Sequence, residues 1–227
     1  MDRNDPAYNG QREYTSLFLR VYDPVILGVL APVVWRCPAA RLADGYRRHA
    51  GPRHLDVGPG TGYFPERAGL PDGSSVTLLD PNRNVLSHAS RRLQRLDITT
   101  VEADVLKPLP VAGPFDSAAL NGVLHCLPGP LPRKAAAIAN VAAVLAPGGV
   151  LFGSTILGDS GRHTWLGRRI LEANNRRGTF DNLGDTEAGL GEILEQSFER
   201  VELETVGSMT IFAATRRRLN RLGGRTA

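Results

Sequence analysis

Three glycines at alternate positions, in the stretch HLDVGPGTGYF at residues 54–64, constrain the fold of this chain more than any other feature. A short run, His54–Val57, comes first, and Gly58, Gly60 and Gly62 follow it directly. Glycine tolerates positive φ and lacks the Cβ that would hold a ligand away from the backbone. The stretch therefore predicts a buried strand that ends in a tight, ligand-facing turn at the start of a helix.

Short β-rich runs alternate with segments of helical spacing over the next hundred residues. We expect parallel strands at His54–Val57, Ser75–Leu79, Ile98–Glu102, Phe115–Leu120 and Gly149–Thr155. Between the last two, the apolar residues of 131–145 fall close to one helical face. Strands that alternate with helices indicate βαβ units with right-handed crossovers, so the sequence predicts an α/β fold.

The C-terminal part departs from this alternation. An extra helix is expected at His163–Arg177, and Thr186 is a candidate N-cap for the helix after it. Two strands, Phe198–Glu204 and Met209–Ala214, flank Gly207-Ser208, which is typical of a hairpin turn. The sequence therefore predicts that the last two strands are antiparallel neighbours.

The length of 227 residues fits a single domain, and 42% hydrophobic with 22% charged residues is typical of a globular rather than a disordered chain. We expect an N-terminal helical cap at 1–50, with one or two short helices and Pro24 at a helix start. A core at 51–215 follows, with an insert at 158–182 that serves as a substrate lid, and then a basic tail at 216–227.

The compartment is predicted from what the sequence lacks. The longest apolar stretch, Val25–Trp35, is too short to span a bilayer, and the polar N-terminus carries no secretory signal. Cys37 and Cys126 form no CxxC pair and have no metal-ligand spacing to a histidine. These features predict a cytoplasmic protein with no membrane span, no disulfide framework and no metal site.

The net charge of +4 is a property of the last 12 residues, which hold five arginines and no acids. Such a tail is able to touch nucleic acid or anionic lipid, although a solvated terminus is the simpler interpretation. The rest of the chain is nearly neutral and offers no basic groove. This balance argues against a polynucleotide as the partner.

The glycine loop departs from the two commonest nucleotide motifs. The dinucleotide pattern requires a glycine where the chain has Tyr63, and no lysine follows as a phosphate loop requires. Asp56 would repel a diphosphate but suits an ammonium or sulfonium group. Asp80 and Asp104 follow the next two predicted strands, where they are able to meet ribose hydroxyls and an adenine amino group. Three acids in these places predict a cationic amino-acid nucleoside as the ligand.

Five motifs occur in order along the chain: D-x-G-x-G-x-G at 56–62, LLDPN at 78–82, ADV at 103–105, FDSAALNGVLHCL at 115–127 and LAPGGVL at 145–151. Together they resemble the class I S-adenosylmethionine-dependent methyltransferases of the small-molecule type, over roughly residues 51–215. The resemblance implies a Rossmann-like, doubly wound sheet of seven strands with an antiparallel last strand. It also implies S-adenosyl-L-methionine as the cofactor.

Carried over position by position, the resemblance implies a set of cofactor-binding residues: Asp56, Gly58, Pro59, Gly60, Thr61, Gly62, Asp80, Pro81, Asn82, Asp104, Val105, Asn121 and Gly122. Asp56 and the glycine loop would hold the methionine moiety, Asp80 the ribose and Asp104 the adenine. Each of these residues also has a structural alternative; for example, Gly62 serves helix packing only, and Asn82 caps the following helix.

Methyl transfer is an in-line displacement that depends on alignment, and a weakly acidic hydroxyl acceptor also needs a base within hydrogen-bond reach. His125, four residues after Asn121, is the best-placed candidate base, and His163 at the start of the extra helix is the second. The alternative for His125 is a histidine that only shapes its loop.

The acceptor pocket is expected from parts outside the shared core. Tyr14, Tyr22, His125 and Trp165 are the candidate substrate-binding residues, although aromatic residues at helical spacing also serve as core. The chain reads Asn121-Gly-Val-Leu where methyltransferases of nucleobase or glutamine amino groups have N-P-P-Y or D-P-P-Y. We therefore expect a small-molecule acceptor that is aromatic, quinone-like or polyketide-like, as in secondary metabolism, with oxygen, nitrogen and carbon all left open.

Two other functions remain open at this stage. The Arg-rich tail is compatible with an RNA or protein methyltransferase that uses it as an anchor. The fold is also compatible with a non-methylating scaffold, because folds of this kind are re-used. A homodimer is left open as well.

Overall fold

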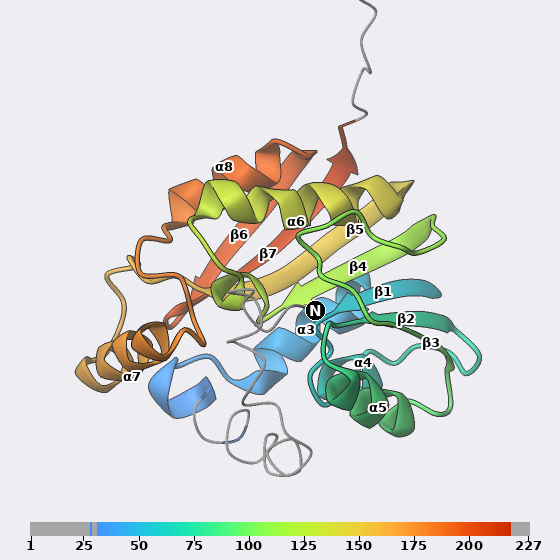
Figure 1. Ribbon diagram of the computed structural model, residues 1–227, viewed down its shortest axis with the longest axis horizontal. Helices are drawn as coiled ribbons and strands as arrows, with labels where there is room; N and C mark the ends of the chain where they lie inside the picture. The colour runs from blue at the N-terminus through green and yellow to red at the C-terminus, as the bar shows by residue number, and fades with distance from the viewer. Residues whose placement is uncertain (1–27, 29–30, 219–227) are drawn as a thin grey trace, which may run out of the picture.

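The computed structural model describes residues 28 and 31–218, which form one seven-stranded sheet with helices on both faces (Figure 1). The strands are β1 Arg53–Val57, β2 Ser75–Leu79, β3 Asp97–Val101, β4 Phe115–Asn121, β5 Leu145–Ile156, β6 Phe198–Val206 and β7 Met209–Arg217. The helices are α3 Ala39–His49, α4 Tyr63–Glu66, α5 Arg83–Arg92, η2 Leu124–Cys126, α6 Leu131–Val144, α7 Trp165–Arg177 and α8 Glu187–Glu195.

The strand order is β3-β2-β1-β4-β5-β7-β6. The first five strands of that order run parallel to one another, and β7 runs antiparallel to both β5 and β6. This confirms the predicted doubly wound α/β sheet with its antiparallel last strand. The order reverses between β1 and β4, and sheets of this type bind ligands at such a point.

The two faces of the sheet are covered by different helices. Helices α6 and α8 cover one face, where Ile138, Val141 and Leu194 are fully buried, and α3, α4 and α5 lie on the other (Figure 1). On that second face Tyr46 of α3 packs edge-on against Phe152 of β5, with ring centroids 5.0 Å apart. Helix α7 lies beyond the sheet, at the end where the parallel strands finish (Figure 1).

The predicted helix at His163–Arg177 begins two residues too early. The structure starts α7 at Trp165, because the side chain of Thr164 accepts a hydrogen bond from Gly167 N at 3.0 Å and so caps the helix there. His163 therefore lies in the connecting segment and not in the helix. Thr186 caps α8 as predicted, by accepting from Gly189 N at 3.0 Å.

The predicted tail also begins too early. Strand β7 runs through Arg217, whose Nη1 donates to Ala142 O and Ala143 O of α6 at 3.0 Å each. Arg218 Nε donates to Glu195 O at 2.8 Å, and Arg216 pairs with Glu199 at 3.2 Å. Three of the five tail arginines are thus bound to the domain. Arg217 and Arg218 bind the last carbonyls of α6 and α8, which attract cations, and Arg216 binds a carboxylate of β6.

Several expectations fall on residues that the structure does not describe. Tyr14, Tyr22 and Pro24 lie in 1–27, and the last nine residues of the tail lie in 219–227. Within the described ranges, none of the helices is both long and apolar enough to cross a membrane.

Candidate active site

The glycine loop joins β1 to α4 and holds three glycines at positive φ, +66° at Gly58, +56° at Gly60 and +77° at Gly62. A Cβ at Gly58 would lie 2.7 Å from Val123 Cγ2, so this glycine lets the loop approach the segment after β4. A Cβ at Gly62 would lie 3.2 Å from Ala89 Cα of α5. Gly62 therefore has the packing role that was its structural alternative.

The middle glycine differs from the other two. No described atom lies within 4 Å of a Cβ built on Gly60, so this position faces open space. A backbone that bends toward open space, beyond the carboxyl end of a parallel strand, is what a bound nucleoside needs. The loop thus fits the cofactor that the sequence implies.

Asp56 is more deeply buried than its predicted role suggests. Its carboxyl group is fully buried beneath the loop, where Tyr46 Oη donates to both oxygens at 3.2 Å. His54 Nε2 lies 3.9 Å from Asp56 Oδ2, and His54 Nδ1 contacts Ser117 Oγ at 2.8 Å. Burial raises the pKa of Asp56 to about 8 and lowers the pKa of His54 to about 3. The Asp56 carboxyl group is therefore held by Tyr46 of α3 and lies beside His54, and its contact with the methionine moiety stays a prediction.

Asp80 lies at the same edge, directly after β2. It is partly exposed, and its Oδ1 accepts a hydrogen bond from Asn82 N at 2.7 Å. Burial raises the pKa of Asp80 to about 7. Asn82 Oδ1 accepts from Asn84 N at 2.9 Å and so caps α5, which is its structural alternative.

The residues after β3 and β4 complete this edge of the sheet. Asp104 Oδ1 accepts from Leu106 N at 2.9 Å, while Val105 is buried in the core. Asn121 Oδ1 accepts from Ser154 Oγ of β5 at 2.5 Å, and Gly122 has φ +73°. The strand order brings the ends of β1 to β4 together, so the predicted cofactor residues share one edge.

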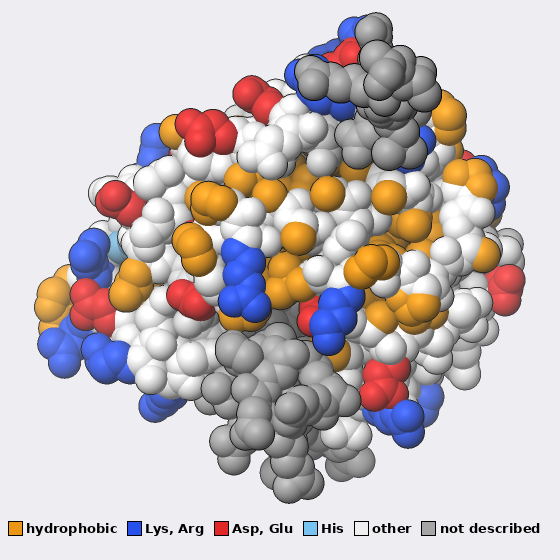
Figure 2. All heavy atoms as spheres, turned by 45° about the horizontal axis from the view of Figure 1, so that its top comes forward, with side chains coloured by type: hydrophobic (Ala, Val, Ile, Leu, Met, Phe, Trp, Pro, Cys, Tyr) orange, Lys and Arg blue, Asp and Glu red, His pale blue; other side chains and the backbone are white. Residues whose placement is uncertain are grey.

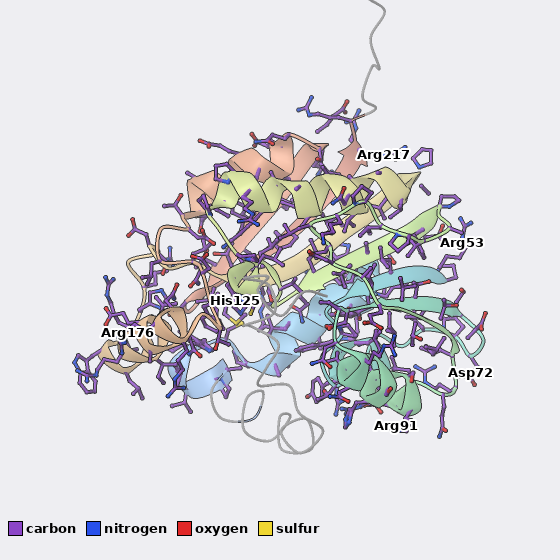
Figure 3. All side chains as sticks on the ribbon, viewed as in Figure 1. Arg53, Asp72, Arg91, His125, Arg176 and Arg217 are labelled. Carbon is purple, nitrogen blue, oxygen red and sulfur yellow. The ribbon has the colours of Figure 1, made fainter. Side chains whose placement is uncertain are left out.

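His125 lies in η2, at the end of the sheet that faces α7 (Figure 3). Its side chain is buried, and Ile156 N, at the end of β5, donates to its Nδ1 at 3.3 Å. Its Cε1 lies 3.9 Å from the position of a Cβ on Gly122, so the ring borders the end of β4. Burial, and secondarily the charge of Lys134, lower the pKa of His125 to about 3.

An aromatic row continues from His125 across the end of β5. Phe180 stands edge-on to His125 with centroids 4.6 Å apart, and Trp35 follows at 6.5 Å from Phe180. His163 stands edge-on to Trp35 at 6.1 Å, and its Nε2 contacts Leu157 O at 2.7 Å. The two predicted catalytic histidines are therefore at opposite ends of this row.

Trp165 lies at the start of α7 and is 75% exposed. Arg169 lies over its ring at 5.2 Å from the centroid. In Figure 2 Lys and Arg side chains crowd the same end of the molecule, mixed with acidic and apolar ones. Leu166 and Val33 are also exposed there, at 45% and 62%.

A buried ion pair that was not predicted from the sequence joins α6 to the segment at residues 181–185. Lys134 of α6 is fully buried, and its Nζ donates to Asp185 Oδ2 and to Asp181 O, both at 2.6 Å. Asn182 Nδ2 donates to Ile156 O at 2.7 Å. One signal was available: Lys134 is one of two lysines in the chain and stands on the apolar helix 131–145.

Comparisons with known proteins place these features in a family. A family model described as a methyltransferase domain matches residues 55–151. Demethylluteothin O-methyltransferase of Streptomyces thioluteus is 38% identical over 208 residues, which cover 91% of this chain and 90% of that protein. N-methyltransferase vrtF of Penicillium aethiopicum is 35% identical over 222 residues and covers 95% and 92%.

The fold recurs in a solved structure at low sequence identity. N-methyltransferase NodS of Bradyrhizobium japonicum in complex with S-adenosyl-L-homocysteine matches with a TM-score of 0.56 and 18% identity, over 95% of this chain and 90% of that one. Together with the identity to curated enzymes, the shared fold and the motif series lead to one conclusion. This chain belongs to the class I S-adenosylmethionine-dependent methyltransferases.

Proposed function

We propose that this methyltransferase acts on a small, flat metabolite of secondary metabolism, held between the glycine loop and α7. The observation that carries this proposal is the row Phe180, Trp35 and His163, which starts at His125 beside the end of β4. Aromatic faces and edges bind flat apolar rings well. Curated relatives named as O- and N-methyltransferases of natural products support the same class of acceptor.

The cofactor residues are proposed from their place at the carboxyl edge of the sheet. Asp80 would accept hydrogen bonds from the ribose, and Asp104 would lie at the adenine. The Gly60 backbone would lie against the methionine part, and Asn121 and Gly122 near the reacting end. When bound, S-adenosylmethionine supplies an electrophilic methyl group on a positively charged sulfur. The chain itself aligns the acceptor and excludes water, and orientation of this kind contributes roughly 7–11 kcal/mol in favourable cases.

The described part of the tail does not favour the RNA or protein alternative. Arg217 and Arg218 donate hydrogen bonds to carbonyl groups of the domain, and this competes with binding to a phosphate backbone. A reducing, cytoplasmic compartment stays our inference, and the free thiols of Cys37 and Cys126 support it.

Two measurements test this proposal. Calorimetry with S-adenosylmethionine is expected to show binding, and no binding at about 10–100 µM would refute the cofactor assignment. Incubation with methyl-labelled cofactor and a cell extract, followed by mass spectrometry, is expected to label a small molecule. Label on protein or RNA, with activity lost when residues 219–227 are deleted, would favour the alternative.

A further inference from the structure

The hydrogen bond at His125 Nδ1 fixes which ring nitrogen carries the proton. Ile156 N is a backbone N–H and is only able to donate, so Nδ1 must accept. A neutral imidazole carries one proton, which is therefore on Nε2. Thr155 Oγ1, 3.4 Å from Nδ1, is compatible with this tautomer because a hydroxyl group either donates or accepts. His125 thus presents a donor, not a lone pair, at its second nitrogen.

The surroundings of His125 oppose a second proton. The ring is buried, and Phe180 packs edge-on against it at 4.6 Å. Lys134 supplies a buried positive charge, paired with Asp185, and Asp181 N donates to His125 O at 2.9 Å. Burial and Lys134 lower the pKa of His125 to about 3, in agreement with the geometry. A general base needs surroundings that favour its protonated form, and these surroundings disfavour it.

We propose that His125 binds the acceptor oxygen as an Nε2–H donor, and that the acceptor is an acidic enol or phenol that reacts as its anion. This inference rests on the proposed function and names the acceptor class of the same site. An N–H donor stabilises an oxygen anion more than a neutral hydroxyl, because hydrogen bonds to charged groups are the stronger ones.

The chemistry balances without a base. The acceptor gives up its proton to water before it binds. Its oxygen anion then forms the new O–C bond with its own electron pair, while the C–S bond breaks and that pair stays on sulfur. No proton remains to be removed from the acceptor. Both products are neutral at the reacting atoms, because the negative charge of the oxygen cancels the positive charge of the sulfonium. An alkyl alcohol cannot follow this route, because it is scarcely ionised near neutral pH.

Ring nitrogen NMR tests the donor directly, without turnover. The full chain, labelled at histidine nitrogens and saturated with S-adenosylhomocysteine, is compared with His125→Gln to assign the signals. We expect an unprotonated Nδ1 and a protonated Nε2 from about pH 5.5 to 8.5. A titration inside that range, or a proton on Nδ1, would overturn the inference.

Turnover of named probes tests the acceptor class. The probes are 4-nitrophenol and 4-hydroxy-6-methyl-2-pyrone as acidic acceptors, and benzyl alcohol as the non-acidic one. We expect methylation of at least one acidic probe and none of benzyl alcohol. Methylation of benzyl alcohol, or of no acidic probe by enzyme that binds the cofactor, would contradict the inference. Failure to bind the cofactor at all would instead contradict the proposed function.

Two substitutions separate a donor from a base. Gln places an amide N–H near the position of Nε2, so His125→Gln is expected to keep kcat/KM within about tenfold of the native value. His125→Leu removes the donor and is expected to lose about 100-fold. If His125 were the base, both variants would lose about 10²–10⁴-fold. If His163→Phe abolished the pH dependence of the rate, the base would be His163 and the inference would fail.

Discussion

The two halves of the proposed site share one edge of the sheet but are built in different ways. The cofactor half consists of turns after β1, β2 and β3, where backbone conformation and short local hydrogen bonds place Gly60, Asp80 and Asp104. In the acceptor half, Lys134 of α6 binds Asp181 O and Asp185, which lie 47 and 51 residues further along the chain. The same segment binds η2 through Asp181 N and β5 through Asn182. The first half is therefore specified locally and the second by long-range packing, and substitutions should affect the two differently.

The largest effect is expected in the acceptor half. Lys134→Met leaves Asp185 buried without its cation, which costs about 3–5 kcal/mol of unfolding free energy. Lys134→Met combined with Asp185→Leu removes both charges and should restore most of that loss. Urea unfolding measures both variants, and equal losses in the single and the double variant would mean that the ion pair is not what holds this region.

In the cofactor half, Asp80→Ala should weaken binding without a comparable loss of stability. Loss of hydrogen bonds to a charged acceptor costs about 1.5–3 kcal/mol, or roughly a 10–150-fold weaker dissociation constant. Asp72→Ala is the matched control, because Asp72 is an exposed acid at the opposite edge of the sheet (Figure 3). Calorimetry with S-adenosylhomocysteine distinguishes them, and similar affinities of the two variants would remove Asp80 from the site.

Gly60→Ala and Gly69→Ala form a second matched pair. Both glycines have positive φ, +56° and +72°, and neither has a described atom within 4 Å of a built Cβ. Each alanine should cost a similar 1–2 kcal/mol, approximately the penalty of left-handed backbone. Only Gly60→Ala should lose cofactor affinity, because Gly69 lies outside the loop. Unaltered affinity in Gly60→Ala would show that the open face of the loop is not used.

The buried carboxyl groups and the buried histidines are expected to change the stability with pH in opposite directions. The pKa values of Asp56 and Asp80 are raised to about 8 and 7, so the folded state binds more protons and stability falls as pH rises from about 4. The pKa values of His54 and His125 are lowered to about 3, so their contribution is complete above about 6.5 and is lost below it.

Above about pH 6.5, of these four groups only the two carboxyl groups still change the stability with pH. Stability should fall between about pH 6.5 and 8, by up to about 1.4 kcal/mol per pH unit for each group that still titrates. Asp56→Asn should flatten this fall. Urea unfolding at about pH 6.5 and at about pH 8 measures this fall in stability. An unchanged fall in Asp56→Asn would show that a group other than Asp56 binds the proton.

The smallest effect on stability is expected at Trp165. The side chain is 75% exposed, so Trp165→Ala should change the unfolding free energy by less than about 0.5 kcal/mol. A rise in KM for the identified acceptor, with unchanged cofactor affinity, would place Trp165 at the acceptor. No change in KM would leave it as a solvated surface residue.

The difference between local and long-range contacts also explains which features could be predicted from the sequence. Strand positions, the Thr186 cap and the hairpin were predictable, because periodicity and capping are local. The burial of Asp56 under Tyr46 and the Lys134–Asp185 pair depend on elements that meet only in the folded chain. The hydrogen bond from Ile156 N to His125 Nδ1 also joins two elements that meet only in the folded chain, and no local pattern encodes it.

The most direct test of this division is calorimetric titration of S-adenosylhomocysteine into three proteins: the native chain, Asp80→Ala, and the double variant Lys134→Met/Asp185→Leu. We expect native binding with a dissociation constant of about 10 µM or tighter, at least tenfold weaker binding in Asp80→Ala, and native affinity in the double variant. A double variant that loses affinity as much as Asp80→Ala does, or a native chain that binds nothing, would contradict the two-part site.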